Sequence, residues 1–305
     1  MGLLIPMSMP LSGAALRAGA LEIVVLGGHL LLYPTGVRQE KPAVAPRRPA
    51  DRPPVLLLHG FTDNRSVFVL LRRALGADGL RHVEAYNYSP FTVDLRVTAR
   101  HLARRVEELC ARTGHDRVDL VGHSLGGLVG RYYVQRLGGD ARVRTLVTLG
   151  TPHSGTRVAP FMDAHPLVRQ MRPDSEVLAE LAAPAPGCAT RCVAFWSEFD
   201  ALLSPAGSAR IEHADLRVEN VQVTGIGHLA LPAHPAVIAA SGAPSTGPDR
   251  SPYRTRAPLP SPSRPTTVSR TNFELKAKAA SFGDRKAAEC PVPEIWGPGE
   301  DCRGE

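Results

Sequence analysis

The feature that most constrains the fold is a run of branched apolar residues leading into three glycines around one serine, Leu120-Val-Gly-His-Ser-Leu-Gly-Gly-Leu-Val129. Glycine lacks a Cβ, so this density of glycines indicates a backbone that bends sharply or is closely approached. The apolar run 118–121 is typical of a buried strand, and residues 125–137 have a helical pattern. The stretch therefore predicts a strand, a tight turn carrying Ser124 and a helix in direct succession.

The same alternation of short apolar runs with helical segments extends over residues 54–240. Strands are expected at 55–58, 82–86, 118–121, 143–149, 191–196 and 218–223, and helices at 67–75, 97–113 and 125–137. Short strands that alternate with helices are typical of βαβ units, in which a parallel sheet carries helices on both faces. We therefore interpret residues 54–240 as one α/β domain.

The composition changes on both sides of this domain. Residues 1–35 form an apolar segment, 36–53 a linker, and 241–305 a Pro/Ser-rich tail that we expect to be disordered. A membrane span needs about 20 apolar residues, whereas Arg17 and Glu22 interrupt the N-terminal segment. A membrane anchor, an export signal, and a helix that packs on the domain or lies in a membrane interface all stay open. Membrane association through residues 14–33 is thus one expectation.

Charge and cysteine content exclude other classes of protein. The formal net charge is +7, but the basic residues are scattered, so we expect a solvated basic surface and no nucleic-acid partner. The five cysteines leave at least one without an intrachain partner. Cys188 and Cys192 are close enough in sequence to pair, or to be packed thiols. The pattern contains no metal-ligand cluster, and no metal or other cofactor is expected.

The serine turn matches a motif with a known mechanism. Gly122-His-Ser-Leu-Gly126, between a strand and a helix, is the G-x-S-x-G nucleophile elbow in its required context. We expect the turn to project Ser124 above the carboxyl edge of the sheet and His123 to shape the turn. Gly122 and Gly126 would allow the strand and the helix to pack closely. Ser124 is therefore the predicted nucleophile.

Three stretches resemble α/β-hydrolases, and among them small bacterial triacylglycerol lipases and esterases: Leu58-His-Gly-Phe61, Gly122-His-Ser-Leu-Gly-Gly127 and Thr148-Leu-Gly-Thr-Pro-His-Ser-Gly155. The resemblance implies a mostly parallel central sheet with helices on both faces and a short cap segment. It also implies a serine hydrolase that cleaves carboxylic esters, lipids among them, through a Ser-His-Asp triad and an acyl-enzyme.

The serine needs a base, and the base needs an orienting carboxylate, in the chain order Ser, acid, His in this fold. His228 follows the last expected strand in Gly225-Ile-Gly-His-Leu, in a turn at the carboxyl edge, and is the predicted base. Asp200 follows the strand 191–196, resembles the acid of the family and is the predicted carboxylate. Glu198 is the runner-up.

The oxyanion hole needs two backbone N–H groups. We expect them from Leu125, directly after the nucleophile, and from Phe61, in the loop after the first strand. Phe61, Phe161, Met162 and Leu167 would line an acyl pocket, although the segment 158–171 is equally well read as a helix packed on the domain.

Other functions stay open on the same residues. An acyltransferase or a thioesterase would use the same triad, and a non-catalytic lipid-binding member of the fold is a further alternative. The tail follows His228 in sequence, so we predict that its deletion leaves ester hydrolysis intact.

Overall fold

The computed structural model describes residues 13–40, 52–79, 82–88, 92–157 and 165–242. The chain divides into two units, residues 1–248 and 249–305, and all described residues lie in the first. Phe161, Met162, most of the 36–53 linker and nearly all of the 241–305 tail lie outside the described residues, so the expectations for them stay predictions.

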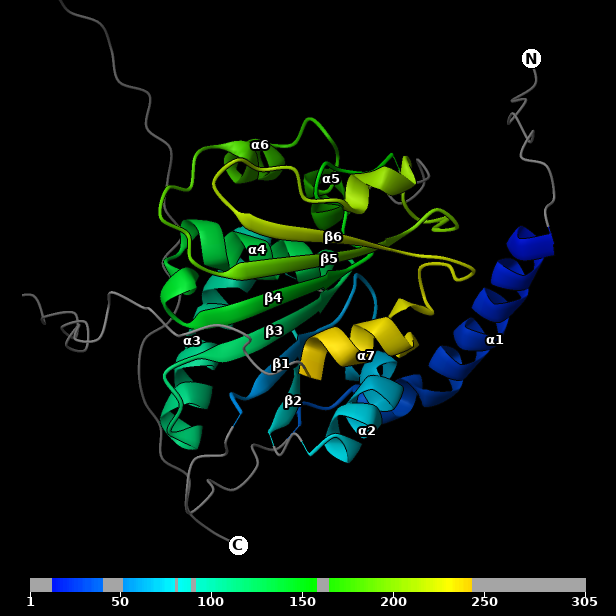
Figure 1. Cartoon of the computed structure of the whole chain (residues 1–305), viewed down its shortest axis with the longest axis horizontal. Coiled ribbons are helices and arrows are strands. Elements are labelled where there is room, and N and C mark those ends of the chain that lie inside the picture. The colour runs from blue at the N-terminus through cyan, green and yellow to red at the C-terminus, as the bar shows by residue number, and fades with distance from the viewer. Residues whose placement is uncertain (1–12, 41–51, 80–81, 89–91, 158–164, 243–305) are drawn as a thin grey trace, which may run out of the picture. The chain divides into compact units, whose positions relative to one another are not determined.

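A six-stranded parallel sheet forms the centre of the first unit (Figure 1). Its strands are β1 (Val55–Leu58), β2 (Val83–Tyr86), β3 (Val118–His123), β4 (Val143–Leu149), β5 (Arg191–Ser197) and β6 (Arg217–Val223). Their order is β2-β1-β3-β4-β5-β6, and every neighbouring pair is parallel. The predicted parallel α/β sheet is therefore confirmed, with each strand within two residues of its expected bounds.

Helices follow most of the strands, as the alternating pattern predicts. They are α1 (Gly13–Gly36), α2 (Val69–Ala77), α3 (Leu95–Thr113), α4 (Leu125–Arg136), α5 (Pro166–Gln170), α6 (Glu176–Ala182) and α7 (Pro235–Gly242). Short 3₁₀ turns lie at 65–68, 139–141, 206–209 and 231–233. The first of these replaces the start of the helix expected over 67–75, because the Asn64 side chain accepts a hydrogen bond from the N–H of Ser66 and begins the turn early.

The two faces of the sheet bury separate apolar clusters. Leu56 and Leu58 of β1 pack with residues of α3 and α4, whereas Val55 and Leu57 pack with residues of α2 and α7. This alternation follows from the pleat of a strand, in which successive side chains point to opposite faces. Because helices cover both faces, β1 is apolar and buried along its whole length.

Helix α1 packs on the domain along one side, and its other side, called the bare side below, is exposed to solvent. Its less exposed residues recur at helical spacing: Ala18, Glu22, Val25, His29, Leu32 and Gly36. Large apolar side chains on the rest of the helix are exposed: Leu16, Ile23, Val24, Leu26, Leu30 and Leu31. By length and composition alone, α1 would also suffice to cross a membrane. The structure thus shows contacts of α1 with the domain, and the anchor, the export signal and the interfacial helix stay predictions.

The cysteines in the described residues are unpaired. Cys110, Cys188 and Cys192 are free thiols, so the bridge between Cys188 and Cys192 is not formed. Burial raises the pKa of the Cys192 thiol to about 12. These residues act as small packing groups and not as reactive thiolates.

Candidate active site

Ser124 is the single residue between the end of β3 and the start of α4. Its φ of 52° and ψ of −120° are strained for a residue with a side chain. The surroundings hold this conformation, because the N–H of Ser124 donates to the Leu149 carbonyl at 2.8 Å. The Thr151 hydroxyl donates to the Ser124 carbonyl at 2.9 Å. The chain after β4 therefore fixes the turn at the carboxyl edge of the sheet.

The glycines of this turn lie where a side chain would collide with backbone. A Cβ on Gly122 would come within 2.5 Å of the N and Cα atoms of Gly127, and one on Gly126 would meet the Leu58 carbonyl. The close approach of β3, α4 and β1 thus requires glycine at both positions, as the motif predicts.

His228 and Asp200 meet at the same edge. His228 Nδ1 lies 2.7 Å from Asp200 Oδ2, although 28 residues separate them in sequence. A carboxylate only accepts hydrogen bonds, so Nδ1 carries the proton and Nε2 of the neutral ring is left to accept one. The N–H groups of Leu202 and Leu203 donate to the other carboxylate oxygen, at 3.0 and 3.1 Å. By contrast, Glu198 is exposed.

The environment of His228 favours its charged form. Burial by itself would keep the ring neutral, but the charge and hydrogen bond of Asp200 favour the charged form, and the pKa of His228 is raised overall. Glu22 and Asp63 add to this increase. A raised pKa strengthens the ring as a proton acceptor.

Gly150 lies next to His228 and Asp200, and the sequence pattern did not predict a role for it. It follows β4 with a φ of 52°. A Cβ at this position would lie 2.9 Å from His228 Nδ1 and 3.0 Å from Asp200 Oδ2. The available signal was its place directly after a buried strand, in the Thr148–Gly155 stretch that carries the family resemblance.

The loop after β1 passes beside the serine. A Cβ on Gly60 would lie 3.3 Å from the Cβ of Ser124. His59 supports the loop, since its ring stacks on Tyr88 at 4.1 Å and its Nδ1 donates to the Gly60 carbonyl at 2.8 Å. Burial lowers the pKa of His59, so the ring is neutral and structural. The loop continues into Thr62, which has a positive φ of 61°.

The two expected oxyanion donors belong to segments next to the serine. Leu125 is the first residue of α4, so its N–H has no acceptor within the helix. Phe61 lies in the loop that passes Ser124, and its ring contacts that of His165 edge-on at 4.8 Å. Leu167, on α5, is 2% exposed and packs in the core cluster. Their roles in the oxyanion hole and the acyl pocket stay predictions.

His123 lies between the nucleophile turn and the loop of His228. Its Nε2 is 3.2 Å from the His228 carbonyl, and its Nδ1 is 3.7 Å from Asp63 Oδ2. Burial of Asp63 opposes its ionisation, but the neighbouring imidazoles of His123, His29 and His59 lower the pKa of Asp63 overall. A second imidazole–carboxylate contact thus lies next to the first.

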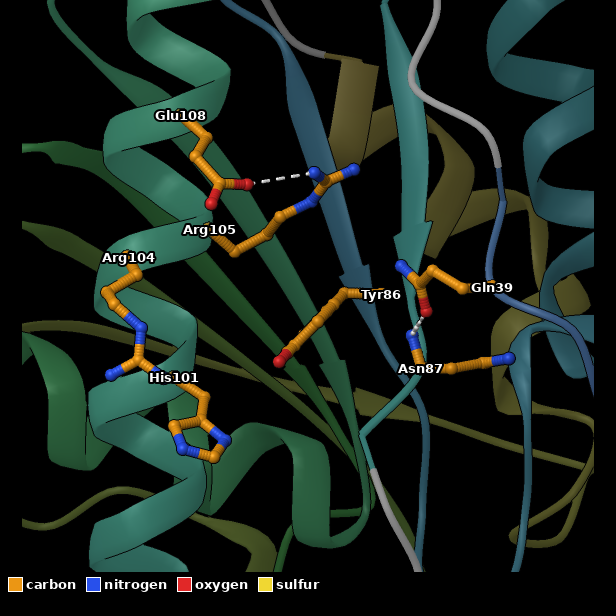
Figure 2. A pocket seen from close by; sticks show the side chains of 7 residues that line it. All are labelled: Gln39, Tyr86, Asn87, His101, Arg104, Arg105 and Glu108. Atoms are coloured by element: carbon orange, nitrogen blue, oxygen red, sulfur yellow. Dashed lines mark hydrogen bonds and ion pairs between the residues drawn. The ribbon is translucent and has the colours of Figure 1, made fainter. Parts of the chain in front are cut away.

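A separate hollow of about 460 Å³ lies beside the edge strand β2. Figure 2 shows the side chain of Tyr86, the last residue of β2, pointing toward α3, which contributes His101, Arg104 and Arg105 to the lining, whereas the Asn87 side chain points away from α3. Its lining contains neither Ser124, Asp200 nor His228, so it is separate from the predicted triad. Within the described ranges, no group of three or more His, Cys, Asp or Glu side chains is arranged to hold a metal ion.

The fold just described has known counterparts. Residues 53–176 match the family model of the α/β hydrolase fold. Lipase B of Aspergillus fumigatus superposes with a TM-score of 0.59 at 16% identity, over 73% of this chain and 67% of that one. The Bacillus licheniformis lipase BlEst2, in its propeptide form, superposes with a TM-score of 0.52 at 16% identity. The superposition covers 69% of this chain and 53% of that one. The chain has the α/β-hydrolase fold.

Part of the sequence is also similar to bacterial lipases. Over 120 residues, the chain is 35% identical to triacylglycerol lipases of Pseudarthrobacter phenanthrenivorans and Burkholderia plantarii. The matched stretch is 37% of this chain, and 37% and 33% of those proteins. The chain therefore resembles bacterial triacylglycerol lipases, and it spans about a third of the length of the curated relatives that it matches.

Proposed function

We propose that this protein hydrolyses carboxylic esters through an acyl-enzyme. His228 Nε2 takes the proton of the Ser124 hydroxyl while Oγ attacks the ester carbonyl, and Asp200 stabilises the imidazolium. The tetrahedral intermediate collapses, and His228 returns the proton to the leaving alcohol. Water then attacks the acyl-enzyme, with His228 again as base, and the carboxylic acid leaves.

The N–H groups of Phe61 and Leu125 hold the oxyanion in this scheme. Each such donor contributes about 3 kcal/mol of transition-state stabilisation. The amino end of α4 adds a favourable field, because its unpaired N–H groups carry partial positive charge.

The observation that supports the proposal most is the 2.7 Å contact between His228 Nδ1 and Asp200 Oδ2, at the sheet edge that carries the strained Ser124. The similarity to triacylglycerol lipases favours acyl esters of lipids as substrates.

The first test is hydrolysis of p-nitrophenyl esters from acetate to palmitate by the wild type, Ser124→Ala and Ser154→Ala. Ser154 is exposed on the loop after β4 and serves as the matched serine control. We expect turnover by the wild type and Ser154→Ala, and none by Ser124→Ala. A wild type that transfers its acyl group to an added alcohol or thiol, without net hydrolysis, would favour an acyltransferase. Absence of any turnover would contradict the proposal.

We also propose that α1 lies on a lipid surface next to the site. Its bare side carries Ile23, Leu30 and Leu31, which are 66–79% exposed. Exposed apolar surface of this kind marks contact with a partner or a membrane. On the opposite side of the helix, Glu22 accepts hydrogen bonds from the domain and Tyr33 donates one to it.

Flotation with phosphatidylcholine vesicles tests this second proposal. The wild type should float, and the triple variant Ile23→Gln, Leu30→Gln, Leu31→Gln should not. Val93→Gln removes an exposed apolar side chain outside α1 and should float like the wild type. Equal flotation by the triple variant would assign membrane binding to another part of the chain. Absence of flotation by the wild type would contradict the proposal.

A further inference from the structure

A carboxylate from the N-terminal helix binds the loop that carries the proposed base. Glu22 Oε2 accepts a hydrogen bond from the N–H of Leu229 at 2.9 Å, and Oε1 accepts one from the N–H of Ala230 at 3.0 Å. These are the two backbone donors that directly follow His228. Glu22 is the single acidic residue of α1 and precedes Leu229 by 207 residues.

The loop is shaped to receive this side chain. A Cβ on Gly227 would lie 2.5 Å from both Cγ and Cδ of Glu22. Gly227 has an ordinary backbone conformation, so its φ does not require glycine. The close approach of Glu22 therefore accounts for the second glycine of Gly225-Ile-Gly-His.

We propose that Glu22 is a positioning residue for His228, which it orients through the backbone of Leu229 and Ala230. This inference rests on the proposed function. Two charge-assisted hydrogen bonds from one carboxylate constrain two successive peptide groups. The side chain of His228 is then held between this anchored backbone and its own bond to Asp200.

The charge of Glu22 also reaches the ring. The charged and titratable groups that face His228 are Asp200 from the loop after β5, Asp63 from the loop after β1, His123 at the end of β3 and Glu22 from α1. Burial lowers the pKa of His228, but Asp200, Glu22 and Asp63 all raise it, and the net result is a raised pKa. Loss of the Glu22 charge should therefore lower the pKa of His228, and a purely structural contact would leave it unchanged.

Helix α1 also binds the loop after β1, which carries the proposed oxyanion donor Phe61. The Tyr33 hydroxyl donates to the Thr62 carbonyl at 3.0 Å, and the Asn64 amide donates to the Tyr33 carbonyl at 3.0 Å. Figure 1 shows α1 passing beside the end of β6 from which the chain leads to α7. Helix α1 thus joins the loop of the base to the loop of the proposed oxyanion donor.

The decisive experiment measures the pKa of His228 by NMR in full-length protein with ¹⁵N-labelled histidine, because this readout needs no turnover. We compare the wild type, Glu22→Gln, Glu22→Asp and Arg17→Gln, which removes an exposed charge from α1 one turn away from Glu22. The pKa of His228 should fall in Glu22→Gln, change less in Glu22→Asp and stay constant in Arg17→Gln. Exchange of the Leu229 and Ala230 amide protons should accelerate in Glu22→Gln. An unchanged pKa together with unchanged exchange would overturn the proposal.

Kinetics on a soluble ester, p-nitrophenyl butyrate, then test the consequence for catalysis. Glu22→Gln should lower kcat roughly tenfold with little change in KM, because misplacement of a catalytic group weakens mainly the transition state. The acidic limb of its kcat/KM profile should move to lower pH. A wild type without turnover but with the NMR changes would contradict the proposed function and leave the role of Glu22 on this loop supported.

Gly227→Ala provides a second variant that keeps the carboxylate. Its methyl group should displace the Glu22 side chain and reproduce the loss of kcat. The double variant Gly227→Ala, Glu22→Gln should lose little more than either single variant, because both remove the same contact. Fully additive losses would show that Gly227 and Glu22 act independently and would contradict the inference.

Discussion

Two residues with a φ of 52°, Ser124 and Gly150, lie at the ends of the neighbouring strands β3 and β4. At Ser124 the positive φ strains the backbone, and hydrogen bonds to Leu149 and from Thr151 hold it. At Gly150 the same φ costs little, because glycine lacks a Cβ, and the missing side chain leaves room for the His228–Asp200 contact. The strained serine and the permissive glycine therefore shape one site together.

We predict that Gly150→Ala lowers kcat by about 100-fold, because its methyl group would press on both partners of the His228–Asp200 hydrogen bond. Ester hydrolysis and urea unfolding measure activity and stability side by side. Gly138→Ala is the matched control, since Gly138 also has a positive φ but a Cβ there would meet nothing within 4 Å. Both variants should lose about 1 kcal/mol of stability from backbone strain. Full activity in Gly150→Ala would contradict the prediction.

The pH dependence of the wild type follows from the raised pKa of His228. The base must be neutral to accept the Ser124 proton, so kcat/KM should fall as the pH decreases through the pKa of His228. We expect the midpoint of this acidic limb above the ordinary value of 6.5, measured by pH-stat titration of tributyrin hydrolysis. A midpoint below 6.5 would show that burial outweighs the neighbouring carboxylates.

At the scale of elements, buried ion pairs hold the short edge strand β2 to α3. Glu84 of β2 pairs with Arg105, at 2.9 Å, and with Arg112 on α3. The Glu84 side chain is 6% exposed. An edge strand of four residues has few ladder hydrogen bonds, so this contact with α3 supports it. The exposed pair of Arg191 and Glu219 joins β5 to the opposite edge strand, β6.

We predict that Glu84→Gln lowers the free energy of unfolding by about 2 kcal/mol, because it leaves two partly buried guanidinium groups without their carboxylate. Glu219→Gln, in the exposed pair, should cost less than about 0.5 kcal/mol. Urea denaturation at pH 7 measures both. Equal losses in the two variants would contradict the assignment of Glu84 as the anchor of β2.

At the scale of the whole molecule, buried neutral histidines link stability to pH. Burial lowers the pKa of His59, and it lowers that of His153 well below the ordinary value. His153 is held between Thr148 and Arg131, and the positive charge of Arg131 also disfavours its protonation. Below pH 6.5 the unfolded chain therefore binds protons that the folded chain does not, and stability falls on acidification. His228 opposes this trend, because its raised pKa favours the folded state at low pH.

We predict that the free energy of unfolding decreases between pH 7.5 and 5.5, by up to about 1.4 kcal/mol per pH unit for each buried neutral histidine. Urea denaturation at several pH values measures the slope. His153→Gln should make the slope shallower, since glutamine does not titrate. A stability that is constant or rises on acidification would contradict the prediction.

Much of this protein was determined by its sequence. The strands, the parallel sheet and the turn at Ser124 followed from local patterns, because hydrophobic periodicity and glycine placement act over a few residues. The order Ser, Asp, His and the strand ends also predicted which side chains would meet at the carboxyl edge. Asp200 and His228 do meet there, at 2.7 Å.

Only the tertiary structure decided what lies around these residues. No local pattern in the apolar segment 14–33 predicts which residues of the domain it contacts. The contact of Glu22 with Leu229 and Ala230 joins residues more than 200 positions apart. It forms only because α1 packs against the loop after β6. Gly150 and Gly227 likewise acquire their meaning from neighbours distant in sequence. Such contacts depend on how whole elements pack, which no local pattern encodes.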